Sequence, residues 1–478
     1  MGSSPSKPAP ASDAASVSEK RDFATMTASM ASLAVSPKST NGSLTLSNLA
    51  SWESEIAAKP KAQLARTILS HSDISSALTA RSAFISDIHV FNTQIDFKTG
   101  PITSQKSSGR CWLFAATNVM RYDVSRKLNL KDFQLSQSYL FFYDKLNKAN
   151  YYLESSIELA DRPVDDRLVT HLAGDLISDG GQWDMVVNLI ENYGIVPQPV
   201  YPESTHSSLS GPLNTLLKTK LREHALILRR LHSSLRAESF SEESIISALR
   251  LKKEELMKEV YTIMTATLGV PPSPDAKFVW EYYDADGKPG RVLQAFASKP
   301  HSPTDSFSLI NDPRNDYSKL YTVDKLGMFS IENMKSTVVK MIKAGVPVFF
   351  GCDVGKFSSR TEGIMDPALF EYENAFDITL GLTKAERLQV NESAMTHAMV
   401  ISAVHLDPVG NPVRFKVENS WGEDVGDKGY FVMTSAWFDE FVYQVVVPRA
   451  LAPKDLVKVY DAGNAVVLSA WDPMGALA

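Results

Sequence analysis

The segment QKSSGRCWLFA, residues 105–115, places a cysteine where a loop gives way to a helix. The loop is rich in serine and ends near Gly109, and no helix breaker follows Cys111 through Leu128. We therefore predict that a helix begins at Cys111. Unpaired backbone N–H groups and the positive end of the helix dipole favour a thiolate there, so we expect a lowered pKa for this thiol. A buried, inert cysteine is the alternative for this segment taken alone.

Gln105 lies in the same loop, six residues before Cys111. Its side-chain amide can point an N–H toward the same region as the backbone N–H of Cys111. Two such donors stabilise the oxyanion that forms when a thiolate attacks a carbonyl group. We therefore expect Gln105 and the Cys111 amide to form an oxyanion hole.

Two segments near the C-terminus supply candidates for the base that a thiol nucleophile needs and for the group that orients it. His397, in MTHAMVISAV, begins an apolar run that predicts a buried strand. Asn419 ends an alternating run from Val413, and residues 407–412 supply the turn of a hairpin. The hairpin brings His397 and Asn419 together, with Trp421 shielding their hydrogen bond. Each residue alone also fits a purely structural role.

The segments QKSSGRCWLFA, MTHAMVISAV and VENSWGEDVGDKGYF resemble the three active-site blocks of papain-like cysteine peptidases. The resemblance implies that Cys111 is the nucleophile, His397 the general base and acid, and Asn419 its orienting residue. It also implies that Gln105 contributes to the oxyanion hole.

Gly180 and Gly181, in SDGGQWD, resemble the glycine pair whose backbone binds extended substrate in the same family. Pairing through backbone hydrogen bonds needs no side chain, which suits glycine. An ordinary turn before a helix over residues 183–193 explains the pair equally well. With Trp421 and Ala478, these glycines are the candidate substrate-binding residues.

The sequence departs from the pattern of secreted papain-like enzymes in two ways, and in both it resembles the intracellular bleomycin hydrolase branch of this family. Ser108 stands where secreted relatives carry an additional disulfide cysteine, which agrees with the lack of a secretory signal. Cys111 and His397 lie about twice as far apart as the ~130–150 residues usual in papain-type enzymes. From about residue 47 onward, the resemblance implies an α+β papain-like fold with a large helical insertion. It also implies a broad-specificity aminopeptidase, hydrolysis of bleomycin and homocysteine thiolactone, and a homohexamer, in some members binding nucleic acid.

The insertion is predicted to contain two long helices. Leucines at helical spacing run from Leu213 to Leu235 after Pro212, and a second helix is expected between about Ser241 and Gly269. The first helix carries a basic face that could contact DNA or RNA, although such faces are more often solvated or contact another subunit. That face consists of Lys218, Lys220, Arg222, Arg229 and Arg230.

The C-terminal segment AGNAVVLSAWDPMGALA contains only one charged residue, Asp472, and is too apolar for a solvated tail. We expect it to lie in a groove. In the family this arm occupies the non-primed side of the cleft, where the carboxylate of Ala478 would pair with the α-ammonium of a substrate. Packing against a neighbouring subunit is the alternative.

Composition removes several other classes. Two cysteines in 478 residues cannot form a disulfide framework, and no Cys/His cluster has zinc-ligand spacing, so we expect no metal and no cofactor. Cys352, in an apolar strand-like run, is expected to be a buried core residue. A net charge of −6 gives no general attraction for nucleic acid or anionic membrane, and no apolar run is long enough to span a bilayer.

The domain boundaries follow from these patterns. A Ser-, Ala- and Pro-rich start predicts a disordered arm, and its acidic residues weaken the case for mitochondrial targeting. We therefore expect a cytoplasmic protein, with a mitochondrial form as the less supported alternative. The expected parts are a disordered arm (1–46), a lead-in of short helices (47–98), a papain-like helical half (99–206), the helical insertion (207–272), the remaining insertion with the papain-like β half (273–460) and a C-terminal arm in the cleft (461–478).

The sequence as a whole predicts a cysteine-type aminopeptidase that acts on peptides. Two alternatives from other classes remain open. One is a nucleic-acid-binding oligomer with secondary peptidase activity, and the other is a transferase that uses the same Cys-His pair on an acyl donor.

Overall fold

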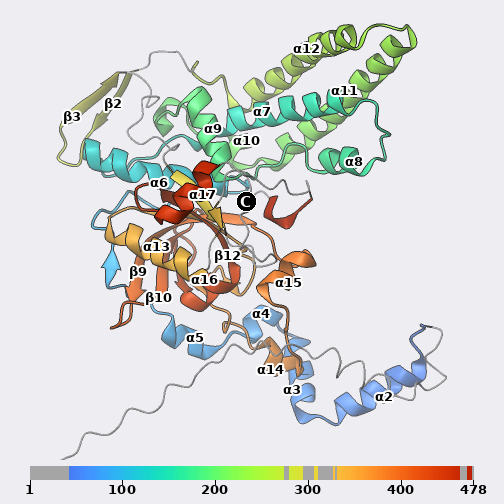
Figure 1. Cartoon of the computed structure of the whole chain (residues 1–478). Helices are drawn as coiled ribbons and strands as arrows, with labels where there is room; N and C mark the ends of the chain where they lie inside the picture. The colour runs from blue at the N-terminus through green and yellow to red at the C-terminus, as the bar shows by residue number, and fades with distance from the viewer. Residues whose placement is uncertain are drawn as a thin grey trace, which may run out of the picture. The chain divides into compact units, whose positions relative to one another are not determined.

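The computed structural model describes residues 42–273, 279–293, 306–310, 327–328, 331–462 and 471–475 (Figure 1). The chain divides into two compact units. The smaller contains residues up to Ala77 together with Ala375–Asp377, and the larger contains the rest. Most of the predicted disordered arm, up to residue 41, lies outside the described residues.

In its described residues, the smaller unit contains three helices, none of which has a buried residue. They are α2 (Leu46–Ala57), α3 (Pro60–Leu69) and α4 (Ile74–Ala77). The Thr45 side chain caps α2 by accepting a hydrogen bond from the backbone N–H of Asn48, and Pro60 occupies the first position of α3. These helices match the short helical stretches expected in the lead-in.

The helical half of the larger unit is built on two helices that pack together. They are α6 (Cys111–Leu128) and α7 (Gln137–Glu158). The Ser136 side chain caps α7. The other helices here are α8 (Arg167–Gly174), α9 (Trp183–Tyr193), the 3₁₀ turn η2 (Gln198–Val200) and α10 (Thr205–Ser208). The short helix α5 (Arg81–Ser86) belongs with the strands instead, because Ala83 shares a small core with Ile364 and Val432.

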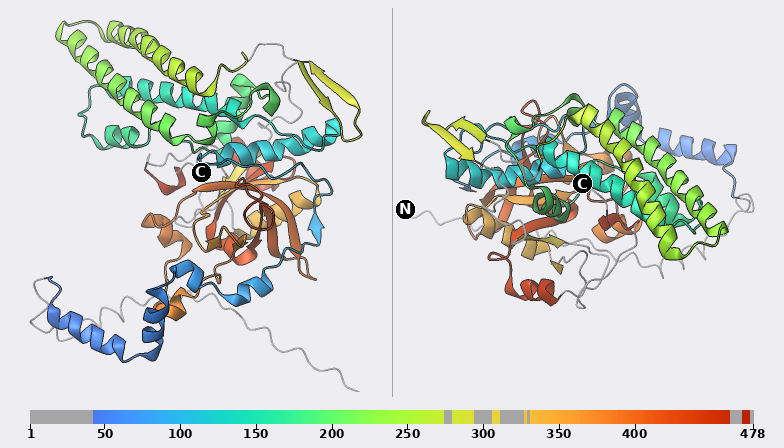
Figure 2. Two further views of the ribbon diagram at one scale, coloured as in Figure 1. Left: turned by 180° about the vertical axis from the view of Figure 1, so that it is seen from behind. Right: turned by 90° about the horizontal axis from the view of Figure 1, so that it is seen from above.

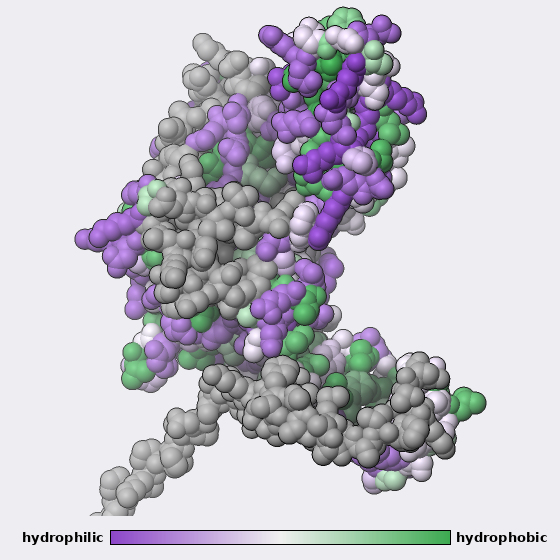
Figure 3. All heavy atoms as spheres, turned by 45° about the vertical axis from the view of Figure 1, so that its right-hand side comes forward, coloured by the Kyte–Doolittle hydropathy of each residue, from purple (hydrophilic) through white to green (hydrophobic). Residues whose placement is uncertain are grey.

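Two long helices, α11 (Gly211–Ala237) and α12 (Glu242–Leu268), lie side by side and pack on α7 (Figures 1 and 2). The leucine stripe is buried from Leu213 to Leu228, Ser241 caps α12, and Gly269 ends it with a φ of 89°. The predicted helical insertion is therefore confirmed. Figure 3 shows hydrophilic side chains over much of the helical region at the top of the view, with smaller hydrophobic areas between them.

The described strands form a ten-stranded sheet and a separate hairpin of β2 and β3. The sheet order is β5-β4-β12-β6-β9-β10-β11-β8-β7, and β1 also pairs with β9. The strands are β1 (Thr93–Gln94), β2 (Val279–Tyr283), β3 (Pro289–Leu293), β4 (Ser306–Ile310), β5 (Gly327–Met328), β6 (Val348–Cys352), β7 (Ser358–Ser359), β8 (Ile364–Met365), β9 (His397–Leu406), β10 (Pro412–Glu418), β11 (Tyr430–Thr434) and β12 (Val442–Pro448). The accompanying helices are α13 (Ile331–Lys343), α14 (Tyr372–Phe376), α15 (Lys384–Gln389), α16 (Ser435–Phe441) and α17 (Lys454–Ala462).

The central strand β9 is buried on both faces, as its continuous apolar sequence predicts. Ala398 and Val400 belong to the core shared with the helical half, whereas Met399 and Ile401 belong to the core on the opposite face. The predicted hairpin of β9 and β10 is antiparallel, with Glu418 opposite Val400. The predicted α+β class with a large helical region is confirmed.

The described part of the C-terminal arm returns to the helical half. It contains the short turn η4 (Pro473–Gly475). The Trp471 ring lies 3.8 Å from the Arg167 guanidinium on α8, and Met474 is buried in the core that also contains Cys111. Ala478 lies outside the described residues.

Candidate active site

Cys111 is the first residue of α6, as predicted, and its side chain is buried against Trp112 and Ala398. Arg110 precedes the helix with a non-helical φ of −91° and ψ of 21°. Burial raises the pKa of the thiol to about 11, although backbone hydrogen bonds from Ala398, Trp112 and Cys111 itself act in the opposite direction. The expected lowering of this pKa is therefore wrong. The loss of solvation outweighs the helix N-terminus because the sulfur has almost no contact with water.

His397 and Asn419 meet at the ends of β9 and β10. The imidazole Nε2 lies 3.0 Å from Oδ1 of Asn419, and both side chains are buried. An amide oxygen only accepts hydrogen bonds, so Nε2 must donate and Nδ1 becomes the basic nitrogen. Burial lowers the pKa of His397 to about 4, only partly opposed by the hydrogen bond to Asn419. The imidazole is therefore neutral at pH 7 and able to accept a proton.

Trp421 covers this pair as predicted. Its ring centroid lies 5.0 Å from that of His397, and Phe431 meets the indole edge-on. Trp421 also contacts the Arg360 guanidinium, 5.0 Å from the ring centroid. The indole is only half buried, so it separates the imidazole from solvent while leaving one side accessible.

Residues 105–110, called here the nucleophile loop, are held by Gln105. Its Nε2 donates to the carbonyl oxygen of Ser108 at 2.6 Å, and its Oε1 accepts from the Ser420 hydroxyl at 2.7 Å. The backbone N–H of Gln105 also donates to the carbonyl oxygen of Ser420. Gln105 thus connects the loop before the nucleophile to the residue after Asn419. One N–H of its amide is used within the loop, which leaves the second for an oxyanion.

Residues 177–181, called here the glycine loop, pass directly over Trp112. A β-carbon added to Gly181 would lie 2.4 Å from the Trp112 ring, so no other residue fits there without a shift. The indole N–H of Trp112 donates to the carbonyl oxygen of Asp179 at 2.7 Å, and Lys148 donates to that of Gly180 at 2.6 Å. The structure therefore places the predicted glycine pair beside the residue that follows the nucleophile.

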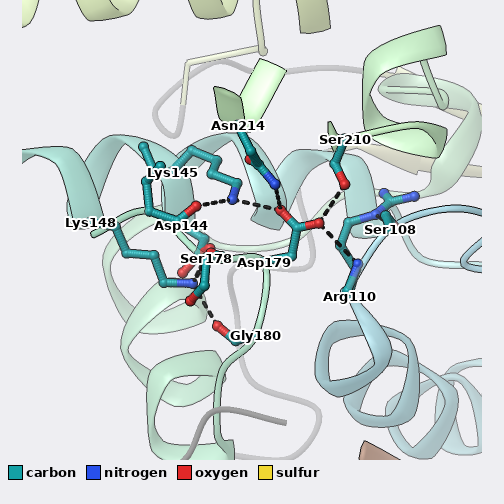
Figure 4. Close-up of polar contacts among 12 residues, drawn as sticks. Ser108, Arg110, Asp144, Lys145, Lys148, Ser178, Asp179, Gly180, Ser210 and Asn214 are labelled. Atoms are coloured by element: carbon teal, nitrogen blue, oxygen red, sulfur yellow. Dashed lines mark hydrogen bonds and ion pairs between the residues drawn. The ribbon is translucent and has the colours of Figure 1, made fainter. Parts of the chain in front are cut away.

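Asp179 is a residue of this site that sequence reasoning missed (Figure 4). Its carboxylate accepts hydrogen bonds from the backbone N–H of Gly109 at 2.9 Å and from Asn214 at 2.7 Å. It also accepts from Ser210 at 2.5 Å and pairs with the Lys145 ammonium at 2.6 Å. No motif spacing marks this residue, because its partners come from three separate parts of the chain.

Two further buried ion pairs flank the candidate catalytic residues and were also missed. Arg110 is completely buried, and its guanidinium contacts both oxygens of Glu203 at 3.0 and 2.8 Å. On the other side, Glu418 pairs with the Arg121 guanidinium at 3.9 Å and accepts a hydrogen bond from the Tyr122 hydroxyl at 2.7 Å, which ties β10 to α6. A buried charge is costly unless it is paired, so both pairs constrain the residues beside Cys111 and Asn419.

Cys352 is fully buried at the end of β6, opposite His397, as expected of a core residue. Its thiol donates to the carbonyl oxygen of His397 at 3.7 Å. In the part of the chain that the structure describes, no three His, Cys, Asp or Glu side chains are grouped to hold a metal ion. In the same residues, no helix is both long and apolar enough to cross a membrane.

Comparison with known proteins agrees with this geometry. The profile of the Peptidase C1-like family matches residues 43–475. The chain belongs to this family. It is therefore a cysteine peptidase, and the resemblance noted in its three active-site segments is confirmed.

Relatives in this family are similar over most of their length. A Saccharomyces cerevisiae protein named "Cysteine proteinase 1, mitochondrial" is 41% identical over 92% of this chain and 94% of its own. "Aminopeptidase C" of Lactobacillus delbrueckii subsp. lactis is 41% identical over 81% and 88%, and "Bleomycin hydrolase" of Gallus gallus is 38% identical over 91% and 99%. The crystal structure of PepW from Lactobacillus rhamnosis is 39% identical, with a TM-score of 0.85, and covers 92% of this chain and all of that one. The papain-like class predicted from the sequence is confirmed.

Proposed function

We propose that this peptidase is a broad-specificity aminopeptidase, in which Cys111, His397 and Asn419 carry out the reaction. The observation that supports these roles most strongly is the 3.0 Å contact between His397 Nε2 and Asn419 Oδ1. It leaves the basic Nδ1 of His397 available, and the helix that begins at Cys111 packs against the strand that begins at His397. A nucleophile, a base and an orienting group are thus carried by adjoining elements.

The proposed reaction is an acyl transfer through the sulfur of Cys111. As Sγ of Cys111 attacks the substrate carbonyl carbon, Nδ1 of His397 takes the thiol proton, and the carbonyl oxygen becomes an oxyanion. The second amide N–H of Gln105 and the backbone N–H of Cys111 stabilise that oxyanion. The oxyanion then collapses and the C–N bond breaks, while the imidazolium donates its proton to the leaving amine. The acyl group remains on Sγ of Cys111 as a thioester. In the second half, His397 removes a proton from water, which attacks the thioester and releases Cys111.

Preference for N-terminal residues is supported by the relatives named aminopeptidase C and by the C-terminal arm. Trp471 contacts Arg167 on α8, and Met474 is buried in the same core as Cys111. An apolar arm fixed there narrows the space available to residues before the scissile bond. The backbone of Gly180 and Gly181 would bind the backbone of the substrate, and Trp421 would line the site next to His397.

Other substrates and the assembly are part of the same proposal. Since a relative is named bleomycin hydrolase, the bleomycin amide is a proposed substrate, and the family resemblance adds homocysteine thiolactone. Both would react by acyl transfer to a thiol. The active form is proposed to be a cytoplasmic homohexamer, as the family resemblance implies. Size measurement in solution and cell fractionation test these two points.

The nucleic-acid alternative receives no support. On α11, Lys218 and Lys220 form ion pairs within the helical region, while Arg222 and Arg229 donate to backbone carbonyl groups at or just before α8. Most of the predicted basic face is thus used to fix neighbouring segments. The comparisons likewise give no nucleic-acid partner.

An aminoacyl reporter with a free amino group, compared with its N-acetylated form, tests the proposal. The wild type should cleave the free reporter at least ~100-fold faster, and Cys111→Ala should cleave neither. Equal cleavage of both reporters would reject aminopeptidase specificity, while full activity of Cys111→Ala would reject the mechanism. Truncation before Trp471 should raise cleavage of the acetylated reporter, and an unchanged ratio would reject the role of the arm.

A further inference from the structure

The Asp179 carboxylate joins parts of the chain that are far apart in sequence (Figure 4). One partner, Gly109, is in the nucleophile loop, and another, Lys145, is on α7. The remaining partners are Ser210, which precedes α11, and Asn214 within it. A single carboxylate therefore connects the turn before the nucleophile, the helical half and the start of the insertion.

The backbone of Asp179 makes a second connection to the same site. Its carbonyl oxygen accepts the indole N–H of Trp112, the residue directly after Cys111. The side chain of Asp179 binds Gly109, two residues before the nucleophile. Asp179 thus contacts a residue on each side of Cys111 in the sequence. Gly180 follows Asp179 directly in the chain.

The lysines of α7 fix the glycine loop in the same cluster. Lys145 donates to the carbonyl oxygen of Ile177 at 2.7 Å, and Lys148 donates to those of Ser178 and Gly180 at 2.8 and 2.6 Å. These lysines are balanced by Asp179 and by Asp144, which pairs with Lys148 at 2.8 Å. The loop that would bind substrate backbone is thus held by ammonium groups whose charge the carboxylates neutralise.

The carboxylate of Asp179 is ionised at neutral pH. Burial raises its pKa, but the Lys145 ammonium and the surrounding hydrogen-bond donors lower the pKa by a larger amount. The pKa of Asp179 therefore lies well below the usual range. A charged, fully hydrogen-bonded carboxylate accepts several donors at fixed angles. Replacing the carboxylate with an amide removes the charge that balances Lys145. It also puts an NH2 group, which donates, where a carboxylate oxygen accepted hydrogen bonds from other donors.

We propose that Asp179 is the positioning residue of this active site, and that it holds the nucleophile loop and the glycine loop in the relative arrangement that the reaction requires. It acts through Gly109 and Trp112 on Cys111 and through its own backbone on Gly180. At the loop position where secreted relatives carry a disulfide cysteine, this chain has Ser108, and the polar cluster fixes the loop. The proposal rests on the proposed function, because it assigns the geometry of the same reaction.

A purely structural ion pair would stabilise the protein without changing the chemistry at each folded site. The test therefore compares Asp179→Asn with Asp439→Asn, which removes the charge from another partly buried pair, 2.8 Å from Lys335 on α13. Active sites are counted by end-point titration with an irreversible thiol inhibitor. The kcat and KM for the free-amino reporter, and the rate of Cys111 alkylation by iodoacetamide, are then expressed per active site.

For Asp179→Asn we expect kcat/KM per site to fall about 10- to 100-fold, since displacement of a reacting group by about 1 Å has effects of this size. Both kcat and KM should change, and alkylation should slow at least about threefold. Asp439→Asn should stay within about twofold of wild type in both rates. Wild-type rates per site in Asp179→Asn would overturn the proposal.

If Asp179→Asn does not fold, Ser210→Ala decides the question. It removes one donor to the carboxylate and leaves the ion pair with Lys145 in place. A fall of about threefold in kcat/KM and in alkylation per site supports the proposal, and unchanged values overturn it. The proposed function is judged separately, because wild-type cleavage that is lost in Cys111→Ala supports it whatever Asp179 does.

Discussion

The nucleophile and the base are held in place by different means. Cys111 begins a helix whose preceding loop and neighbouring glycine loop are fixed by buried charges, among them Arg110, Lys145 and Asp179. His397 instead begins a strand that pairs with β6 and β10 through backbone hydrogen bonds. Apart from the contact with Trp421, one side-chain hydrogen bond, to Asn419, orients its imidazole.

The difference follows from the local structure. A strand inside a sheet has its backbone direction fixed by its neighbours, so one hydrogen bond suffices to orient a side chain on it. A loop before a helix has no such ladder, and its position depends on side chains from other segments. The nucleophile side should therefore be sensitive to changes at many residues, and the base side to changes at few.

The largest effect is expected on replacing the nucleophile itself. Cys111→Ala should lower kcat/KM by at least ~10³-fold, because no other group forms the thioester. Cys352→Ala is the matched control, since this thiol is also buried but donates its hydrogen bond to the backbone of His397 and not to its imidazole. It should lose stability through the small cavity and keep activity within a fewfold. A Cys352→Ala variant that is folded but inactive would show that both thiols take part in the reaction.

Asn419→Ala removes the hydrogen bond between Nε2 of His397 and the Asn419 side chain. Without it the imidazole can rotate or change tautomer, so kcat/KM should fall about 10- to 100-fold with little change in KM. Asn411→Ala, on the exposed turn between β9 and β10, is the control and should have wild-type kinetics. If both variants behave alike, the base does not depend on Asn419.

Gly181→Ala tests the packing on the nucleophile side. The added methyl group would lie 2.4 Å from Trp112, so the glycine loop or the indole must move. We expect kcat/KM to fall about tenfold, mainly through KM. Gly174→Ala at the end of α8 is the control, because its β-carbon meets nothing within 4 Å. Equal kinetics in both variants would mean that the glycine loop can shift without cost.

The smallest predicted effect concerns pH and the base side. The pKa of His397 falls from 6.5 to about 4 on folding, so below pH 6.5 the unfolded chain takes up a proton that the folded chain refuses. Stability that is fully present above pH 6.5 is then lost as the pH falls toward 4. Between pH 7 and pH 5, protonation of His397 in the unfolded chain should lower the free energy of unfolding by about 2 kcal/mol.

In His397→Gln this part of the acid sensitivity disappears. Melting temperatures of the wild type and the variant, measured between pH 7 and pH 5, provide the check. The wild-type value should fall more steeply with acid than that of the variant. Parallel curves would mean that His397 titrates near its ordinary pKa and is not buried as the structure shows.

The sequence predicted the residues whose chemistry depends on local pattern. The helix start at Cys111 and the hairpin that brings His397 to Asn419 can be read from breakers, alternation and turns. The roles of Asp179, Glu203 and Glu418 could not be predicted, because each depends on partners brought together only by the tertiary fold.

The same limit explains the wrong expectation for the nucleophile. The position of Cys111 at a helix N-terminus is visible in the sequence, but the depth of its burial depends on how α6 packs against β9. That burial raises the pKa of the thiol to about 11. In the proposed reaction, His397 is the base that removes the proton of this thiol.

Labelling by an irreversible thiol inhibitor, located by peptide mapping, tests the central claim most directly. We predict one label per chain on Cys111, none on Cys352, and loss of activity in proportion to labelling. Labelling should be at least ~10-fold slower in His397→Ala. Label on Cys352 with Cys111 unmodified, or full activity with Cys111 labelled, would contradict this claim.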